Sequence, residues 1–189
     1  MWQSRHRCRI AASDSFCLFA ALLILTIPLQ WLMAAAAAAT VHEMGHICTV
    51  WLSGGRINSI VVQPGSVSIH TSPMGRRQNA MALAAGPLAS LSLLLIFPFF
   101  PRIAFCGAVQ GVFNLLPLMP LDGGKLLRML SMDEEICKTV ETSCLTILIC
   151  AGGAVGLWTN SLLPATLPLL LFLSRRRKIP CKPAQFGVQ

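Results

Sequence analysis

Residues 31–52 read WLMAAAAAATVHEMGHICTVWL, an apolar run with one cluster of polar side chains near its middle. The cluster has the pattern His-Glu-x-x-His and consists of His42, Glu43 and His46. Residues four positions apart lie on one face of an α-helix, so both imidazoles reach the same point. Two imidazoles at this spacing can bind zinc, and Glu43 is placed to act as the base for a zinc-bound water. Ionisable groups inside a membrane are costly and usually functional.

The composition is that of a protein that crosses a bilayer several times. Of the 189 residues, 54% are hydrophobic and 12% are charged, and the mean hydropathy is +0.67. We therefore predict an all-α polytopic membrane protein with about six transmembrane helices in one domain, residues 1–189. No polar block is long enough for a further soluble domain. The predicted spans are 16–29, 31–52, 79–100, 103–121, 142–158 and 161–173, between basic tails 1–15 and 174–189.

The segment between the second and third spans differs in composition. Arg56 to Ile69 is rich in β-branched residues, and Pro64-Gly65 divides it into two halves. This pattern predicts a small β-hairpin or loop. Residues 125–141 hold most of the remaining charge and are predicted to form a solvated helix or turn.

Basic residues indicate the orientation of the chain in the membrane. With six spans and a cytoplasmic N-terminus, fourteen of the fifteen Lys and Arg residues lie on the cytoplasmic side. Both termini are therefore expected in the cytoplasm, and the basic clusters are expected to contact anionic lipid. The net charge of +8 does not indicate nucleic-acid binding, because no surface of interleaved basic and aromatic residues is visible.

A catalytic zinc ion needs a third protein ligand and an open position. Asp122 is the other carboxylate that ends an apolar run, and a carboxylate oxygen is an acceptable zinc ligand. The alternative for Asp122 is a simple turn residue, since Asp-Gly-Gly is a common turn signal. We predict one Zn²⁺ per chain.

Asn114, Pro117 and Pro120 precede Asp122 in the chain. Prolines interrupt backbone hydrogen bonding, which a membrane tolerates where a cavity or a neighbour satisfies the groups that are left. We predict that Asn114 and Pro117 contact the substrate, with Asn114 donating to its backbone or to a developing oxyanion. The alternative for Asn114 is a hydrogen bond to a neighbouring helix. No role is assigned to Ser90 or His70.

The order of these motifs resembles the site-2 protease family of intramembrane zinc metalloproteases. The resemblance covers roughly residues 18–175 and rests on the His42–His46 motif, a later span with Gly86-Pro87, and the segment NLLPLMPLDGGK at 114–125. The last segment looks most like the bacterial stage-IV sporulation branch, which processes a sigma-factor precursor. The resemblance implies that zinc is bound by His42, His46 and Asp122, with Glu43 as the base. Many members of that family carry a PDZ or a CBS domain, and neither is expected here.

These observations together predict an integral-membrane zinc endopeptidase that cuts a membrane-associated protein near the cytoplasmic face. The expected location is a bacterial cell membrane, and the expected partners are the lipid bilayer, the substrate and inhibitory membrane proteins. Because a protease binds its substrate in an extended form, we predict that Val61 and Val62 pair with the substrate backbone along a strand edge. The alternative is a non-enzymatic zinc-binding scaffold or transporter component, although the repeated half-helices of transporters are not visible.

Overall fold

A computed structural model of the protein describes residues 9–12, 21, 23–63, 66–131 and 133–159. The described chain is mostly helical and divides into two compact units, residues 1–114 and 115–189. In chain order the elements are β1 (Arg9–Ala12), α2 (Leu29–Leu52), β2 (Ile57–Gln63), β3 (Ser66–Thr71), α3 (Arg76–Ser92), the 3₁₀ helix η1 (Leu93–Ile96), α4 (Pro101–Leu115), α5 (Asp122–Leu130) and α6 (Glu134–Thr159).

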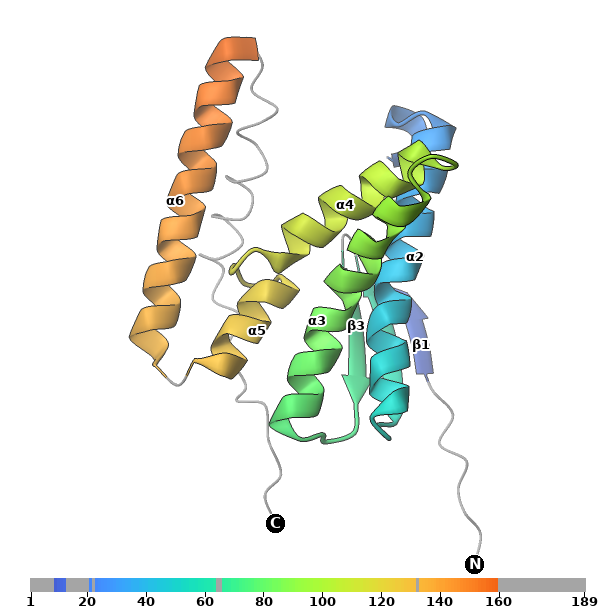
Figure 1. Ribbon diagram of the computed structural model, residues 1–189, viewed down its shortest axis with the longest axis vertical. Helices are drawn as coiled ribbons and strands as arrows, with labels where there is room; N and C mark the ends of the chain where they lie inside the picture. The colour runs from blue at the N-terminus through green and yellow to red at the C-terminus, as the bar shows by residue number, and fades with distance from the viewer. Residues whose placement is uncertain (1–8, 13–20, 22, 64–65, 132, 160–189) are drawn as a thin grey trace, which may run out of the picture. The chain divides into compact units, whose positions relative to one another are not determined.

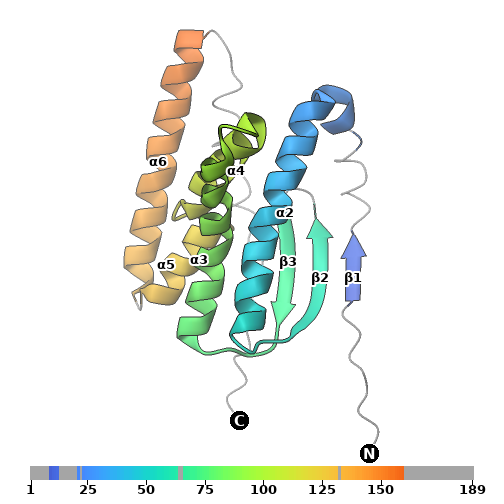
Figure 2. The ribbon, with the colours of Figure 1, turned by 45° about the vertical axis from the view of Figure 1, so that its right-hand side comes forward.

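The first unit is built on the packing of α2 against α3, with the sheet beside α2 (Figures 1 and 2). α2 confirms the helix expected at 31–52. It begins at Leu29, directly after Pro28, whose ring fixes its own φ. Beyond the end of the helix the chain reaches Gly54. Gly54 has a φ of 76°, a left-handed conformation that favours glycine and turns the chain toward β2.

The sheet confirms the predicted hairpin and adds a strand that the sequence analysis missed. β2 pairs antiparallel with β3, and β1 pairs parallel with β2, giving the order β1-β2-β3 (Figure 2). Val61 is paired with both Ala11 and Ser68, and Val62 occupies the next position along the same central strand. The expectation that Val61 and Val62 lie on a free strand edge is therefore wrong, because β1 covers that side of β2.

The helices after the sheet differ from the predicted spans at their ends. α3 begins at Arg76, where the Gln78 side chain accepts a hydrogen bond from the Gly75 N–H (3.0 Å) and so caps the helix. α4 ends at Leu115, whereas hydrophobicity alone extended the fourth span to 121. The reason is Pro117: a proline disfavours helical backbone in the residue before it and cannot donate a helical hydrogen bond.

The second unit contains α5 and α6, which contact each other. Asp133 caps α6, because its Oδ1 accepts the N–H of Glu135 (2.8 Å). The charged stretch 125–141 is not a uniformly solvated segment as predicted. Glu141 is only 1% exposed, and its carboxylate accepts two hydrogen bonds from the Arg128 guanidinium, at 2.9 and 3.2 Å. The run of charges thus contains a buried ion pair between α5 and α6.

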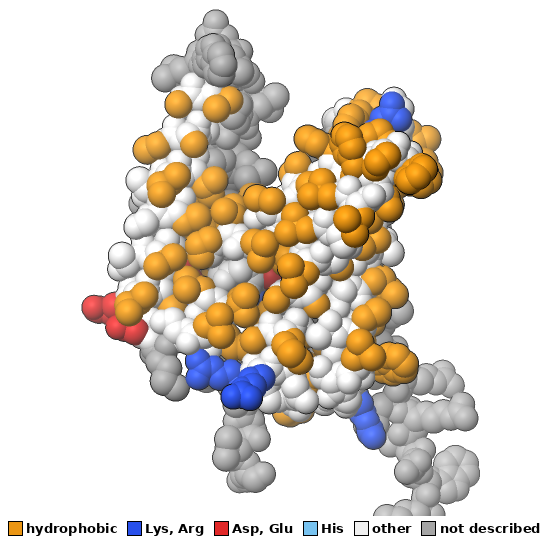
Figure 3. All heavy atoms as spheres, in the orientation of Figure 1, with side chains coloured by type: hydrophobic (Ala, Val, Ile, Leu, Met, Phe, Trp, Pro, Cys, Tyr) orange, Lys and Arg blue, Asp and Glu red, His pale blue; other side chains and the backbone are white. Residues whose placement is uncertain are grey.

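Two stretches of the described chain, Arg76–Ile96 and Glu134–Val155, are long and apolar enough to cross a membrane. α2 is not one of them, since the polar residues of its motif lower its hydropathy. Large apolar side chains are exposed at the surface, for example Leu95 (84%) and Trp51 (74%), and Figure 3 shows hydrophobic atoms spread over the face in view. Such surfaces are unusual in water and suit contact with lipid. The predicted span 161–173 lies outside the described residues, as do residues 16–20 and 22 of the predicted span 16–29.

Candidate metal centre

The His-Glu-x-x-His motif lies in the middle of α2, as predicted. His42 is buried at 3% exposure and His46 is half-buried, and their ring centroids are 4.8 Å apart. The Nε2 atoms of the two rings are 3.2 Å apart. One turn of helix therefore brings two potential ligand atoms to a common point.

The opposite nitrogen of each ring is held by α3. His46 Nδ1 lies 2.8 Å from the backbone oxygen of Ala82, and His42 Nδ1 lies 2.8 Å from the hydroxyl oxygen of Ser90. Histidines that bind metals commonly make such a bond with the nitrogen that does not face the metal. Sequence reasoning did not find Ser90, because a single serine in an apolar span has no pattern of its own.

The spacing of the two Nε2 atoms fits zinc. Tetrahedral zinc with Zn–N distances of about 2.0–2.1 Å places two nitrogen ligands about 3.3 Å apart, close to the observed 3.2 Å. A carbonyl oxygen can only accept, so His46 Nδ1 carries the proton and the neutral ring has its lone pair on Nε2. That lone pair faces His42, where a cation would be stabilised.

Asp122 is the first residue of α5 and is 8% exposed. Its Oδ1 accepts a hydrogen bond from Lys125 Nζ at 2.9 Å, in an ion pair one turn along the helix. A position in the first turn suits a carboxylate, because the helix N-terminus carries partial positive charge. Both the helix terminus and Lys125 stabilise Asp122 in its ionised form, the form that binds metal ions.

His42 and His46 belong to the first unit and Asp122 to the second, and each offers one ligand atom that could hold a metal ion. Two imidazoles and one carboxylate form a donor set that zinc accepts in catalytic sites. The pair of histidines is confirmed as a geometric unit on α2, and Asp122 as the third ligand stays a prediction.

Glu43 is half-buried on α2, directly after His42. A carboxylate here lies next to the candidate metal site without occupying a ligand position, which is the placement expected of a general base.

Asn114 lies in the last turn of α4, and Pro117 lies two residues after the end of that helix. The Asn114 side-chain amide donates to the backbone oxygen of Gln110 at 3.1 Å, one turn back in its own helix. Among the described residues, the alternative bond to a neighbouring helix is not visible. Pro117 lies in the irregular segment between α4 and α5, which also holds the cis peptide Met119–Pro120. Their substrate-binding roles stay predictions.

Comparison with known proteins agrees with this site. The chain matches the family described as Peptidase M50B-like over residues 15–116, more than half of its length. It therefore belongs to the M50, or site-2 protease, family of membrane metallopeptidases.

Two relatives place the chain within this family. It is 25% identical over 161 residues to stage IV sporulation protein FB of Bacillus subtilis (strain 168), covering 78% of the chain and 56% of that protein. The chain thus spans little more than half the length of this curated relative. Its fold matches the site-2 protease from Methanocaldococcus jannaschii with a TM-score of 0.60 and 19% identity, over 93% of this chain and 92% of that one. The family, this fold and the two apolar helices together indicate an integral membrane protein.

Proposed function

We propose that this protein is a zinc endopeptidase that hydrolyses a peptide bond of a membrane-associated protein near the cytoplasmic face. The observation that carries the proposal is the pair of histidines on α2, with Nε2 atoms 3.2 Å apart and both Nδ1 atoms held from α3. Membership of the M50 family supports the reaction type.

His42, His46 and Asp122 would hold the ion in this proposal, and the donor set of two imidazoles and one carboxylate supports the assignment. When bound, zinc polarises a carbonyl and lowers the pKa of a coordinated water. The Glu43 carboxylate takes the proton of the attacking water and delivers it to the leaving amine nitrogen. Asn114 is proposed to bind the substrate backbone, which requires its amide to leave the Gln110 carbonyl.

The substrate is proposed to bind as an added strand. Within the described sheet, β2 is covered on both sides, whereas no strand pairs with the outer side of β3. An extended peptide can add to such an edge through backbone hydrogen bonds. We therefore transfer the substrate-pairing role from Val61 and Val62 to the outer edge of β3, Ser66–Thr71.

A membrane-associated sigma-factor precursor is the first substrate to test. The segment from Asn114 to Lys125 resembles that of the sporulation branch, and the similarity to the Bacillus subtilis protein supports the same class. Inhibitory membrane proteins are proposed as partners on the same ground. A bacterial cell membrane is proposed as the location, and the distribution of Lys and Arg supports a cytoplasmic position of both termini.

The decisive experiment compares two glutamate variants of the purified full chain. Glu43→Gln keeps the size of the side chain and removes the base, so zinc content should be unchanged while cleavage falls by at least about a hundredfold. Glu134→Gln is the matched control, because Glu134 is an exposed residue of α6 paired with Lys138 at 3.0 Å. Cleavage by the Glu43→Gln protein at the unmodified rate would leave the zinc-binding scaffold as the better account.

A further inference from the structure

Three residues of α3 form a single ridge facing the histidines of α2. Ala82, Gly86 and Ser90 are spaced four residues apart, and residues at this spacing stack along one side of a helix. All three are buried, and Ser90 is completely so. The ridge is therefore part of the contact between α2 and α3 and not part of the surface (Figure 2).

Each residue of the ridge has a different relation to an imidazole. Ala82 presents its backbone oxygen to His46 Nδ1, and Ser90 presents its hydroxyl to His42 Nδ1, both at 2.8 Å. Gly86, between them, provides space: a Cβ atom at this position would collide with the His46 ring. One helix face thus sets the position of both rings.

The two Nδ1 contacts differ in whether they determine which ring nitrogen of the histidine carries the proton. A backbone carbonyl can only accept, so Ala82 requires the proton of His46 to be on Nδ1. A serine hydroxyl can donate or accept, so the contact with Ser90 alone permits either tautomer of His42. A His42 that binds a cation through Nε2 must carry its proton on Nδ1, and Ser90 must then accept that proton in a hydrogen bond.

We propose that Ser90 is a positioning residue for metal binding: its hydroxyl accepts the His42 Nδ1–H and fixes the ring with Nε2 directed toward the ion. The inference rests on the proposed zinc site and adds a residue that acts through His42. Removing a comparable second contact of a metal ligand typically lowers metal affinity about 10–100-fold. Ser90→Ala should weaken zinc binding by about tenfold or more.

Zinc affinity is measured by competition with a chelator, using the full chain in detergent. Ser92→Ala is the matched control, since Ser92 is an exposed serine of the same helix whose hydroxyl donates to the Ala89 carbonyl at 2.7 Å. We expect tighter zinc binding by the Ser92→Ala protein than by the Ser90→Ala protein. If His46→Ala abolishes zinc binding while Ser90→Ala retains the unmodified affinity, the zinc site stands and the role of Ser90 is refuted. Retention of zinc by the His46→Ala protein would instead refute the zinc site.

A second measurement separates positioning from a general effect on folding. Nitrogen-15-labelled histidine lets NMR follow the two Nδ1–H groups separately in the zinc-loaded protein. In Ser90→Ala the His42 Nδ1–H should exchange faster with solvent, while that of His46, held by the Ala82 carbonyl, should keep its rate. Equal acceleration at both rings would show that the substitution loosens the helix pair, and the proposal would fail.

Discussion

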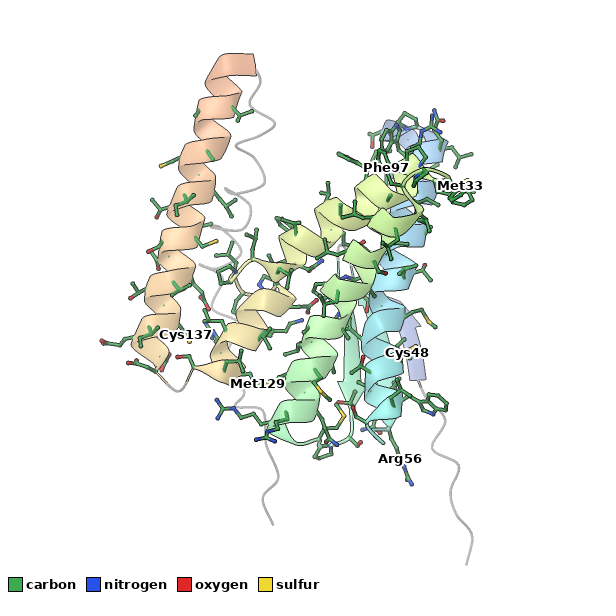
Figure 4. All side chains as sticks on the ribbon, in the orientation of Figure 1. Met33, Cys48, Arg56, Phe97, Met129 and Cys137 are labelled. Atoms are coloured by element: carbon green, nitrogen blue, oxygen red, sulfur yellow. The ribbon has the colours of Figure 1, made fainter. Side chains whose placement is uncertain are left out.

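Replacing Arg128 by methionine tests the buried ion pair of the second unit. Arg128→Met keeps most of the apolar stem of the side chain but removes the guanidinium. The guanidinium donates through Nε and a terminal nitrogen to the two carboxylate oxygens of Glu141. Figure 4 shows that α5 and α6 lie beside each other where Met129 and Cys137 are labelled.

The loss of folding free energy should depend strongly on which partner of the Arg128–Glu141 ion pair is replaced. The Glu141 side chain is 1% exposed, so in Arg128→Met a buried carboxylate loses its cation, a change that typically costs about 3–5 kcal/mol. The Arg128 side chain is 43% exposed and can turn toward solvent, so Glu141→Gln should cost only about 1 kcal/mol. We therefore expect Arg128→Met to be the more damaging change by at least about 2 kcal/mol.

The thiol of Cys137 is a local probe of this effect. Cys137 is 3% exposed and lies one turn before Glu141 on α6, so a maleimide reaches it only when the region opens. A loss of about 3 kcal/mol corresponds to roughly a hundredfold faster labelling. Cys150, exposed on the apolar part of the same helix, is the internal control for a membrane-permeant maleimide and should keep its rate. Equal labelling of Cys137 in the Arg128→Met and Glu141→Gln proteins would refute the argument from unequal burial.

Three further predictions concern the metal, the topology and the substrate edge. Metal analysis should find about one zinc per unmodified chain and almost none in the His46→Ala protein. Cysteine-accessibility labelling should place residues 53–79 and 174–189 on the cytoplasmic side, and an external position for 174–189 would contradict the orientation. Hydrogen-bonded and non-hydrogen-bonded pairs alternate along an antiparallel ladder, so, counting from a hydrogen-bonded Gln63–Ser66 pair, the N–H of Ser68 should point toward β2 and that of Ile69 away from it. Ile69→Pro should then reduce cleavage with zinc content intact, whereas Ser68→Pro should also break the hairpin. Full cleavage by the Ile69→Pro protein would refute substrate pairing at the outer edge of β3.

The helices and the hairpin were predictable where the local signal was strong. The apolar run around the motif predicted the helix α2, and the β-branched residues around Pro64-Gly65 predicted the strands β2 and β3. β1 was missed because its four residues, Arg9–Ala12, carry little strand signal, and their strand forms through a partner distant in sequence. The end of α4 was misplaced because hydrophobicity was given more weight than Pro117.

The candidate site divides in the same way. His42 and His46 follow from helical periodicity, and Asp122 follows from the rarity of carboxylates at the ends of apolar runs. Ser90 and the burial of Glu141 depend on contacts between elements, which no local pattern records. A serine in an apolar span and a glutamate in a charged stretch each have an ordinary interpretation until a neighbour is known.

The parallel pairing of β1 with β2 also constrains how the chain is threaded through the bilayer. Arg9 pairs with Ser59 and Ala12 with Val62, so the two strands lie on one side of the membrane. The chain that connects them must then cross the bilayer an even number of times. A single crossing there would carry β1 to the opposite face and leave β2 with β3 as its only partner. The pairing of β1 with β2 thus requires an even number of membrane crossings between β1 and the hairpin.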